Sequence, residues 1–271
     1  MKLGILLFGH LRTFEYSGKY FVKNIAKKYD CDIFIHTWDE TDAHTKCWED
    51  RKKKNVLPVD DKIIKKIRAL YSPKALKIGH QHIENEVLVQ SSDGKKELSL
   101  NGMNFMFESM RAANLLRIEY ERSSGTKYDY ILVTRPDVAI YNYLPIEETV
   151  REAEELNLNI SNTRFFAGLY GNSKTNVRLM INRTPDILFF GVPSVIDRYI
   201  QANEHFSFES VNRSFKNVVS VYTRNEIKAG LTPVEICFAC NKDWKNYSYD
   251  ELQKFLHRKS IIQRFLRLFK A

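Results

Sequence analysis

One short run without any polar side chain constrains the fold of this chain more than any other feature. Residues 3–8 (LGILLF) have the length of a strand, and a strand that is apolar on both sides must be covered on both faces of its sheet. An amphipathic stretch at 16–28 follows, and residues 31–38 (CDIFIHTW) have the pattern of a second strand. Two such strands joined by one helix predict a βαβ unit, in which the strands are parallel.

A second strand–helix–strand unit is predicted further along the chain. Met103, Met106 and Met110 recur at helical spacing within a helix expected at 101–122, and residues 130–134 (YILVT) form another apolar strand. Further helices are expected at 60–71, 146–156 and 193–206, and the polar region 39–58 is expected to be a mobile loop. The sequence therefore predicts an α/β fold: one domain over 1–243 with a Rossmann-like, mainly parallel sheet flanked by helices, followed by a tail at 244–271.

The charge and the hydropathy of the sequence limit the kinds of binding partner that we expect. The 271 residues carry a formal net charge of +9, which favours an anionic partner such as a phosphorylated substrate or a membrane surface. The sequence contains no nucleic-acid-binding motif, so we expect no nucleic-acid partner. We find no signal-peptide pattern and no apolar run near the ~18 residues of a membrane-spanning helix, so we expect a cytoplasmic protein.

Two predicted strands end in charged residues that belong together. The first strand is followed by Gly9 and Arg12, and the strand at 130–134 is followed by Arg135 and Asp137. Ligands of open α/β sheets bind beyond the carboxyl ends of the strands, and parallel strands share that edge. Glycine lets a ligand approach the backbone, and the arginine fork suits phosphate oxygens. The alternative is that both arginines cap helices or pair with neighbouring carboxylates.

Several segments together resemble bacterial glycosyltransferases of the GT-A type, which build lipopolysaccharide and capsule. They are LLFGHLRTFE, YDCDIFIHTWDE, LYSPKALKI and MNFMFESMRAANLLRIEYERSSGTKYDYILVTRPDV. The resemblance covers residues 1–141 well and 142–240 loosely. It implies a GT-A-like domain that transfers a sugar from a nucleotide-diphosphate donor, either a GDP-sugar such as GDP-fucose or a UDP-sugar, to a hydroxyl of a lipopolysaccharide or capsule glycan.

The resemblance also implies roles for individual residues. A donor site is expected from the three strand ends and the long helix, with the nucleotide and diphosphate at the first strand, the base at the second, and the diphosphate or donor sugar at Arg135 and Asp137. The candidate donor-binding residues are Gly9, His10, Arg12, Thr13, His36, Thr37, Trp38, Asn104, Glu108, Arg135 and Asp137, and the candidate catalytic bases are Asp186 and Glu226.

The chain departs from the GT-A pattern at the metal site. GT-A enzymes commonly carry Asp-x-Asp where this chain has Arg135-Pro136-Asp137. Asp137 is the candidate ligand if Mg²⁺ or Mn²⁺ is used, with waters completing the shell. In the other interpretation Arg135 supplies the positive charge itself. We therefore expect a weaker metal dependence than in Asp-x-Asp enzymes.

Other classes of function remain open. A non-catalytic nucleotide-sugar-binding regulatory or interaction module would bind the same ligands without turnover. A sugar-phosphate nucleotidyltransferase has a similar sheet, but it would need a glycine-rich loop after the first strand, where GHLRTFE has one glycine.

The residue pattern of the tail at 244–271 predicts an amphipathic helix that binds to a surface. Drawn as a helix, residues 259–270 place Ile261, Phe265 and Phe269 on an apolar face opposite Arg264 and Arg267. This pattern favours docking on an anionic membrane at the inner face of the inner membrane, near a lipid-linked acceptor. The alternative is packing on the catalytic domain or on a second subunit of an oligomer. Sedimentation with anionic vesicles, with and without residues 259–271, distinguishes the two.

Overall fold

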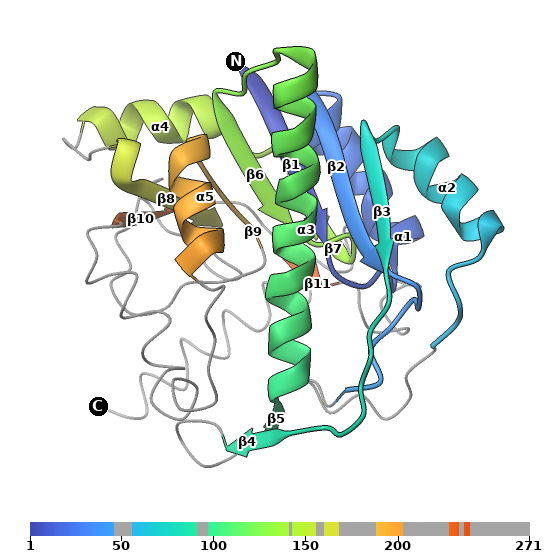
Figure 1. The fold of residues 1–271 in the computed structure, drawn as a ribbon. Coiled ribbons are helices and arrows are strands. Elements are labelled where there is room, and N and C mark those ends of the chain that lie inside the picture. The colour runs from blue at the N-terminus through green and yellow to red at the C-terminus, as the bar shows by residue number, and fades with distance from the viewer. Residues whose placement is uncertain are drawn as a thin grey trace, which may run out of the picture.

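A seven-stranded sheet flanked by helices forms the centre of the protein (Figure 1). The computed structural model describes residues 1–45, 56–90, 97–140, 143–155, 160–167, 188–202, 228–232 and 236–238. In the sheet the strands follow the order β10-β8-β9-β6-β1-β2-β3. Their bounds are β1 Lys2–Phe8, β2 Asp30–Trp38, β3 Ala75–Gly79, β6 Tyr130–Thr134, β8 Thr163–Ala167, β9 Leu188–Gly191 and β10 Lys228–Thr232.

The sheet is mainly parallel. β1 pairs in parallel with β2 and with β6, β2 with β3, and β8 with β10, whereas β9 runs antiparallel to both of its neighbours. The predicted βαβ unit is therefore confirmed, and so is the α/β fold class with a mainly parallel sheet flanked by helices. Two shorter pairings accompany the sheet: β7 (Val138–Ile140) with β11 (Ile236–Phe238), and β4 (Leu88–Gln90) with β5 (Glu97–Ser99).

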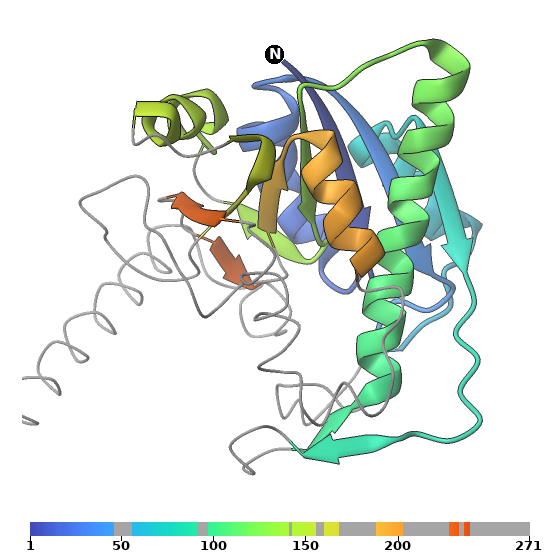
Figure 2. The ribbon, with the colours of Figure 1, turned by 60° about the vertical axis from the view of Figure 1, so that its left-hand side comes forward.

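Each face of the sheet is covered by its own set of helices. Side chains alternate along a strand, so Ile5 and Leu7 join one apolar cluster while Leu6 and Phe8 join the other. On the first face lie α1 (Phe14–Phe21), the π-helix Val22–Ala26, α2 (Asp61–Tyr71) and α4 (Ile146–Glu155). On the second lie α3 (Leu100–Ser124) and α5 (Pro193–Ala202), which Figure 2 shows side by side. Coverage on both faces explains why the strands are apolar throughout.

Local sequence signals set the helix ends. The Asp60 side chain accepts a hydrogen bond from the Ile63 N–H at 2.9 Å, so Asp60 caps α2 as its sequence pattern indicates. The helix expected at 16–28 begins two residues earlier and changes to a π-helix at Val22, where the Lys27 N–H donates to the Val22 carbonyl at 2.9 Å. The short 3₁₀ turn Ile160–Asn162 precedes β8.

The region expected as a mobile loop is anchored in its described parts. Arg12 donates its backbone N–H to the Thr41 carbonyl, and Thr41 donates to Leu57, both at 2.8 Å. Asp42 and Ala43 are buried. Residues 39–45 and 56–58 do form a loop, as expected, but backbone bonds that the polar sequence pattern does not reveal tie it to the end of β1.

The predicted tail at 244–271 lies outside the described residues, so its helical form stays a prediction. Among the helices of the described ranges, none combines the length and the apolar composition needed to cross a membrane.

Candidate functional site

Three strand ends meet at one edge of the sheet. In the pairing register Phe8 of β1 lies opposite His36 of β2, and Leu7 lies opposite Thr134 of β6. The segments that begin at Gly9 and at Arg135 therefore leave the sheet at the same edge. The amino-terminal half of α3 projects past this edge in both ribbon views (Figures 1 and 2). This is the edge at which ligands of open α/β sheets bind.

Ser109 of α3 ties two of the strand ends together. Gly9 has a φ of 91°, a left-handed conformation that favours glycine, and its N–H donates to Ser109 Oγ at 2.7 Å. The same oxygen lies 2.7 Å from His36 Nδ1. Ser109 is completely buried, so this hydroxyl adds polar contacts between α3 and the ends of β1 and β2 to the apolar packing of Met110 and Ala113.

We expect Ser109→Ala to lower the free energy of unfolding by about 1–3 kcal/mol, because it leaves the Gly9 N–H without its acceptor in a buried place. Urea denaturation measures this change. Ser123→Ala, at an exposed position of the same helix, is the matched control and should change stability by less than about 0.5 kcal/mol. Equal small effects of both substitutions would contradict the role of Ser109.

Arg12 is held in an unusual backbone conformation between two carboxylates. Its φ is 42°, a region that non-glycine residues seldom adopt. Its side chain donates from Nε to Asp42 Oδ1 at 2.7 Å and from Nη1 to Asp137 Oδ2 at 2.9 Å. The Arg12 side chain is only 10% exposed. The guanidinium is therefore a buried cation that both carboxylates neutralise.

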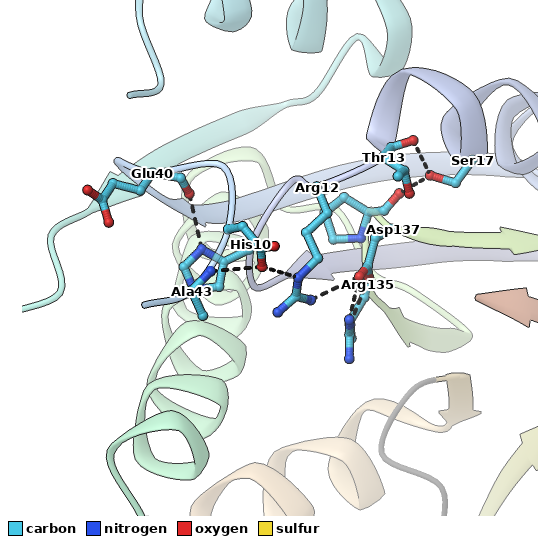
Figure 3. A network of polar contacts seen from close by, with 10 residues as sticks. His10, Arg12, Thr13, Ser17, Glu40, Ala43, Arg135 and Asp137 are labelled. Carbon is cyan, nitrogen blue, oxygen red and sulfur yellow. Dashed lines mark hydrogen bonds and ion pairs between the residues drawn. The ribbon is translucent and has the colours of Figure 1, made fainter. Parts of the chain in front are cut away.

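Asp137 lies between two guanidinium groups (Figure 3). Besides the bond from Arg12, its Oδ1 accepts from Arg135 Nε at 2.8 Å, and its Oδ2 accepts from Arg135 Nη2. The Asp137 side chain is fully buried, while that of Arg135 is 19% exposed. Arg135 is therefore the arginine of this cluster with more access to a ligand.

The cluster stays ionised. Burial by itself would raise the pKa of Asp137, but Arg135 and Arg12 hold that pKa well below its usual range. Burial would lower the pKa of Arg12, but Asp137 and Asp42 raise it above its already high value. Both charges of each ion pair thus persist at every working pH.

Rings line the side of the site next to β2. Trp38 contacts His36 edge to face with ring centroids 4.9 Å apart, and Phe105 of α3 lies 5.4 Å from Trp38. The His10 ring lies 6.4 Å from Trp38. Burial lowers the pKa of His36 to about 4 and, together with Arg12, that of His10 to about 3, so both rings are neutral.

Two of the predicted threonines carry buried hydroxyls without a hydrogen-bond partner in the described part of the chain. Thr13 precedes α1 and Thr37 lies in β2. A buried hydroxyl normally finds a partner. Both oxygens are also closed to solvent, so a ligand atom would reach them only after a local rearrangement.

The structure brings together most, but not all, of the residues that sequence analysis selected. Direct contacts link Arg12, Arg135 and Asp137, and ring contacts link His10, His36 and Trp38. Asn104 and Glu108 are exposed on α3, on the side away from the buried Met110 and Ala113. Asp186 and Glu226 lie outside the described residues.

Sequence analysis missed two residues of the cluster, Asp42 and Ser109. Asp42 follows the second strand, so the same reasoning about shared strand ends could have included it. Ser109 is a small polar residue on the apolar face of the long helix, between Phe107 and Met110. Such a position is a detectable signal, because a buried hydroxyl needs a partner.

The donor set around Asp137 does not fit a divalent cation. Both carboxylate oxygens accept hydrogen bonds from guanidinium groups, and two neighbouring positive charges would repel Mg²⁺ or Mn²⁺. Across the described ranges, no group of three or more His, Cys, Asp or Glu side chains could hold a metal ion. Asp137 is better described as the acceptor that orients Arg12 and Arg135 than as a metal ligand.

One surface hollow of about 460 Å³ lies elsewhere, at the opposite edge of the sheet near Met1 and Tyr130. Its lining carries three carboxylates, from Asp129, Glu147 and Glu154, and one guanidinium, from Arg151. Because the carboxylates are in excess, this hollow suits a diphosphate less well than the arginine cluster does.

No family model matches this sequence, and no curated protein does. Among solved structures the chain is similar to the nucleoside-diphosphate-sugar pyrophosphorylase from Vibrio cholerae RC9, with a TM-score of 0.47 and 11% identity over 95% of this chain and 100% of that chain. It is also similar to S. aureus TarS, with a TM-score of 0.39 and 10% identity over 86% of this chain and 37% of that chain. Structural similarities with TM-scores below 0.5 and about 10% identity carry no argument about the function of this chain.

Proposed function

We propose that this chain is a glycosyltransferase that moves a sugar from a nucleotide-diphosphate donor to a hydroxyl of a lipopolysaccharide or capsule glycan. One observation carries the proposal: Arg135 and Arg12 converge on Asp137 beyond the carboxyl ends of β1 and β6. A guanidinium binds phosphate oxygens with two parallel hydrogen bonds, and since the Nε edge of Arg135 is bonded to Asp137, its outer Nη1/Nη2 edge would bind them. The partly exposed Arg135 suits the diphosphate that departs from such a donor.

The chain's own residues supply the electrostatic part of this reaction. In the transfer step the acceptor hydroxyl oxygen forms a bond to the anomeric carbon, and the bonding pair of the donor linkage leaves with the diphosphate. Arg135 stabilises the negative charge that develops there, an effect that is strong in a water-poor site. Asp137 and Arg12 hold Arg135 in place. If the transfer inverts the anomeric centre, the acceptor proton goes to a carboxylate, for which Asp186 and Glu226 remain the candidates.

Binding of nucleotide sugars tests the proposal. We expect one class of donor, GDP-linked or UDP-linked, to raise the melting temperature increasingly with concentration, because a ligand that binds only the folded state stabilises it. Thermal melting against a panel of nucleotide sugars measures this. No stabilisation by any member at millimolar concentration would contradict the proposed function.

A turnover assay distinguishes a glycosyltransferase from a non-catalytic module that only binds nucleotide sugars. An enzyme releases free nucleotide from the stabilising donor, slowly to water and faster with an acceptor glycan. A non-catalytic nucleotide-sugar-binding module would show the same melting shift and release no nucleotide over hours.

The setting that we propose is the cytoplasmic face of the inner membrane. The basic amphipathic pattern at 259–270 supports it, since such a helix binds anionic lipid headgroups. A lipid-linked acceptor glycan would lie at that surface. Packing of the tail on a second subunit is the competing arrangement.

A further inference from the structure

His10 has one ring nitrogen with a fixed role. Its Nδ1 lies 3.0 Å from the backbone carbonyl of Glu40, a bond drawn in Figure 3. A carbonyl oxygen only accepts, so Nδ1 must carry the hydrogen. Because the ring is neutral, Nε2 then has a lone pair and no hydrogen. The loop after β2 therefore sets the tautomer of His10.

The other ring nitrogen is an acceptor that the protein does not use. Within the described ranges, Nε2 of His10 has no hydrogen-bond partner, although the residue is only 6% exposed. His36 differs in this respect. A Cβ atom added to Gly79 would lie 2.7 Å from His36 Nε2, so that nitrogen packs closely against the backbone of β3. Of these two rings, His10 is the one suited to a ligand.

The groups around His10 explain what kind of ligand atom it can bind. Three charged side chains lie near enough to shift the pKa of its ring: Arg12 and Arg135 lower it, and Asp42 raises it. Guanidinium groups only donate hydrogen bonds, so they suit phosphate oxygens but cannot accept from a hydroxyl. Asp137 already accepts from both arginines. Asp42 Oδ1 likewise accepts from Arg12 and from the Ala43 N–H. For a sugar hydroxyl bound beside the diphosphate, His10 Nε2 is an acceptor that is not already bonded to an arginine.

We propose that His10 Nε2 accepts a hydrogen bond from one hydroxyl of the nucleotide sugar and so selects ligands that carry this hydroxyl. The inference rests on the proposed function, since it places the hydroxyl beside a diphosphate at Arg135. The hydroxyl belongs either to the ribose or to the donor hexose. His10 acts here as a specificity-determining residue and not as a general base, because a neutral ring with so low a pKa takes up protons poorly.

Two substitutions of His10 distinguish the role of Nδ1 from that of Nε2. His10→Asn keeps an amide N–H near the position of Nδ1, where it can still donate to Glu40, but loses the acceptor at Nε2. His10→Gln places its amide near the position of Nε2 and loses the bond to Glu40. His82→Asn, at an exposed histidine of the same chain, is the control. Calorimetric titration of the full-length protein measures the dissociation constant of each ligand.

The ligands come in pairs that differ by one hydroxyl. Nucleoside diphosphates with ribose, 2′-deoxyribose and 3′-deoxyribose test the ribose hydroxyls, and nucleotide sugars with and without single hexose hydroxyls test the donor sugar. For one pair we expect wild type and His82→Asn to bind the hydroxyl-bearing member about tenfold more tightly, as one well-made hydrogen bond allows. His10→Asn should bind both members equally, and His10→Gln should keep part of the preference.

The outcomes are distinct. If wild type binds these nucleotides but His10→Asn keeps the full preference, or if wild type shows no preference within any pair, the role of His10 is refuted while the proposed function stands. If wild type binds none of these nucleotides, the proposed function is refuted, and the inference about His10 is refuted with it. Should His10→Asn not fold, as judged by circular dichroism, the His10→Gln variant decides: a preference unchanged from wild type overturns the inference.

Discussion

Asp137→Ala should destabilise the folded protein by about 3–5 kcal/mol, the typical cost of removing one partner from a buried ion pair. The substitution leaves Arg12 buried with Asp42 and removes the two carboxylate oxygens of Asp137 that accept from Arg135. Urea denaturation gives the change in the free energy of unfolding. Asp61→Ala, at an exposed carboxylate in the first turn of α2, is the control and should cost less than about 0.5 kcal/mol.

The contribution of Asp137 should disappear in acid. Its pKa in the folded protein lies below the value of about 4 that an aspartate has in an unfolded chain. A carboxylate with a lowered folded pKa adds stability that is complete above the unfolded value and is lost as the pH falls toward the folded one. The stability difference between wild type and Asp137→Ala should therefore be constant from pH 8 to about 5 and should shrink below about pH 4. A difference that grows on acidification would contradict the assignment.

This stability effect determines which substitution can report on catalysis. Arg12 and Asp137 are so buried that their alanine variants are expected to lose several kcal/mol of stability, and with it part of their activity, for reasons unrelated to donor binding. Loss of turnover in either variant would not locate the donor site. Arg135 is the residue of the cluster that can be changed while Arg12 and Asp137 stay paired.

Arg135→Ala should reduce donor turnover by about 10²–10³-fold, the loss typical when one preorganised donor to a developing negative charge is removed. The pair between Arg12 and Asp137 remains, so the protein should stay folded at 25 °C. Initial rates of nucleotide release and a urea denaturation curve measure the two effects. Arg135→Lys keeps the charge and loses the fork, so its activity should fall between those of wild type and Arg135→Ala. Arg68→Ala, at an exposed arginine of α2, should behave as wild type.

The same assay addresses the metal. Because guanidinium groups occupy both oxygens of Asp137, turnover should persist in excess chelator. Complete loss of turnover that Mn²⁺ restores would show that a full metal site forms with further ligands. Unchanged turnover in Arg135→Ala would place the diphosphate elsewhere.

Most elements of the fold follow from local sequence patterns. The apolar strands and the apolar face of the long helix were predicted, because strand and helix periodicity depend on residues a few positions apart. The exposure of Asn104 and Glu108 could also have been predicted from the sequence. They share a helix face that avoids Met106 and Met110, so a core-facing stripe of methionines already turns them outward.

The site was predictable only in part. That Gly9, Arg12, Arg135 and Asp137 would share an edge followed from the parallel strands. That Arg12 would be neutralised by Asp42 did not follow, because the segment after β2 has no periodicity that indicates its path. Its course is set by backbone hydrogen bonds from Arg12 to Thr41 and from Thr41 to Leu57.

The sequence by itself determined the strands, the helices, the edge at which the charged residues gather and the expected class of ligand. Only the tertiary structure decided which residues form hydrogen bonds and ion pairs with one another. Gly9 meets Ser109, 100 positions away, and Arg12 meets Asp137, 125 positions away. Such partners are chosen by strand register and by the placement of α3 across the sheet, and these depend on the packing of the whole core. This packing also buried Arg12 and left Arg135 as the arginine within reach of a ligand.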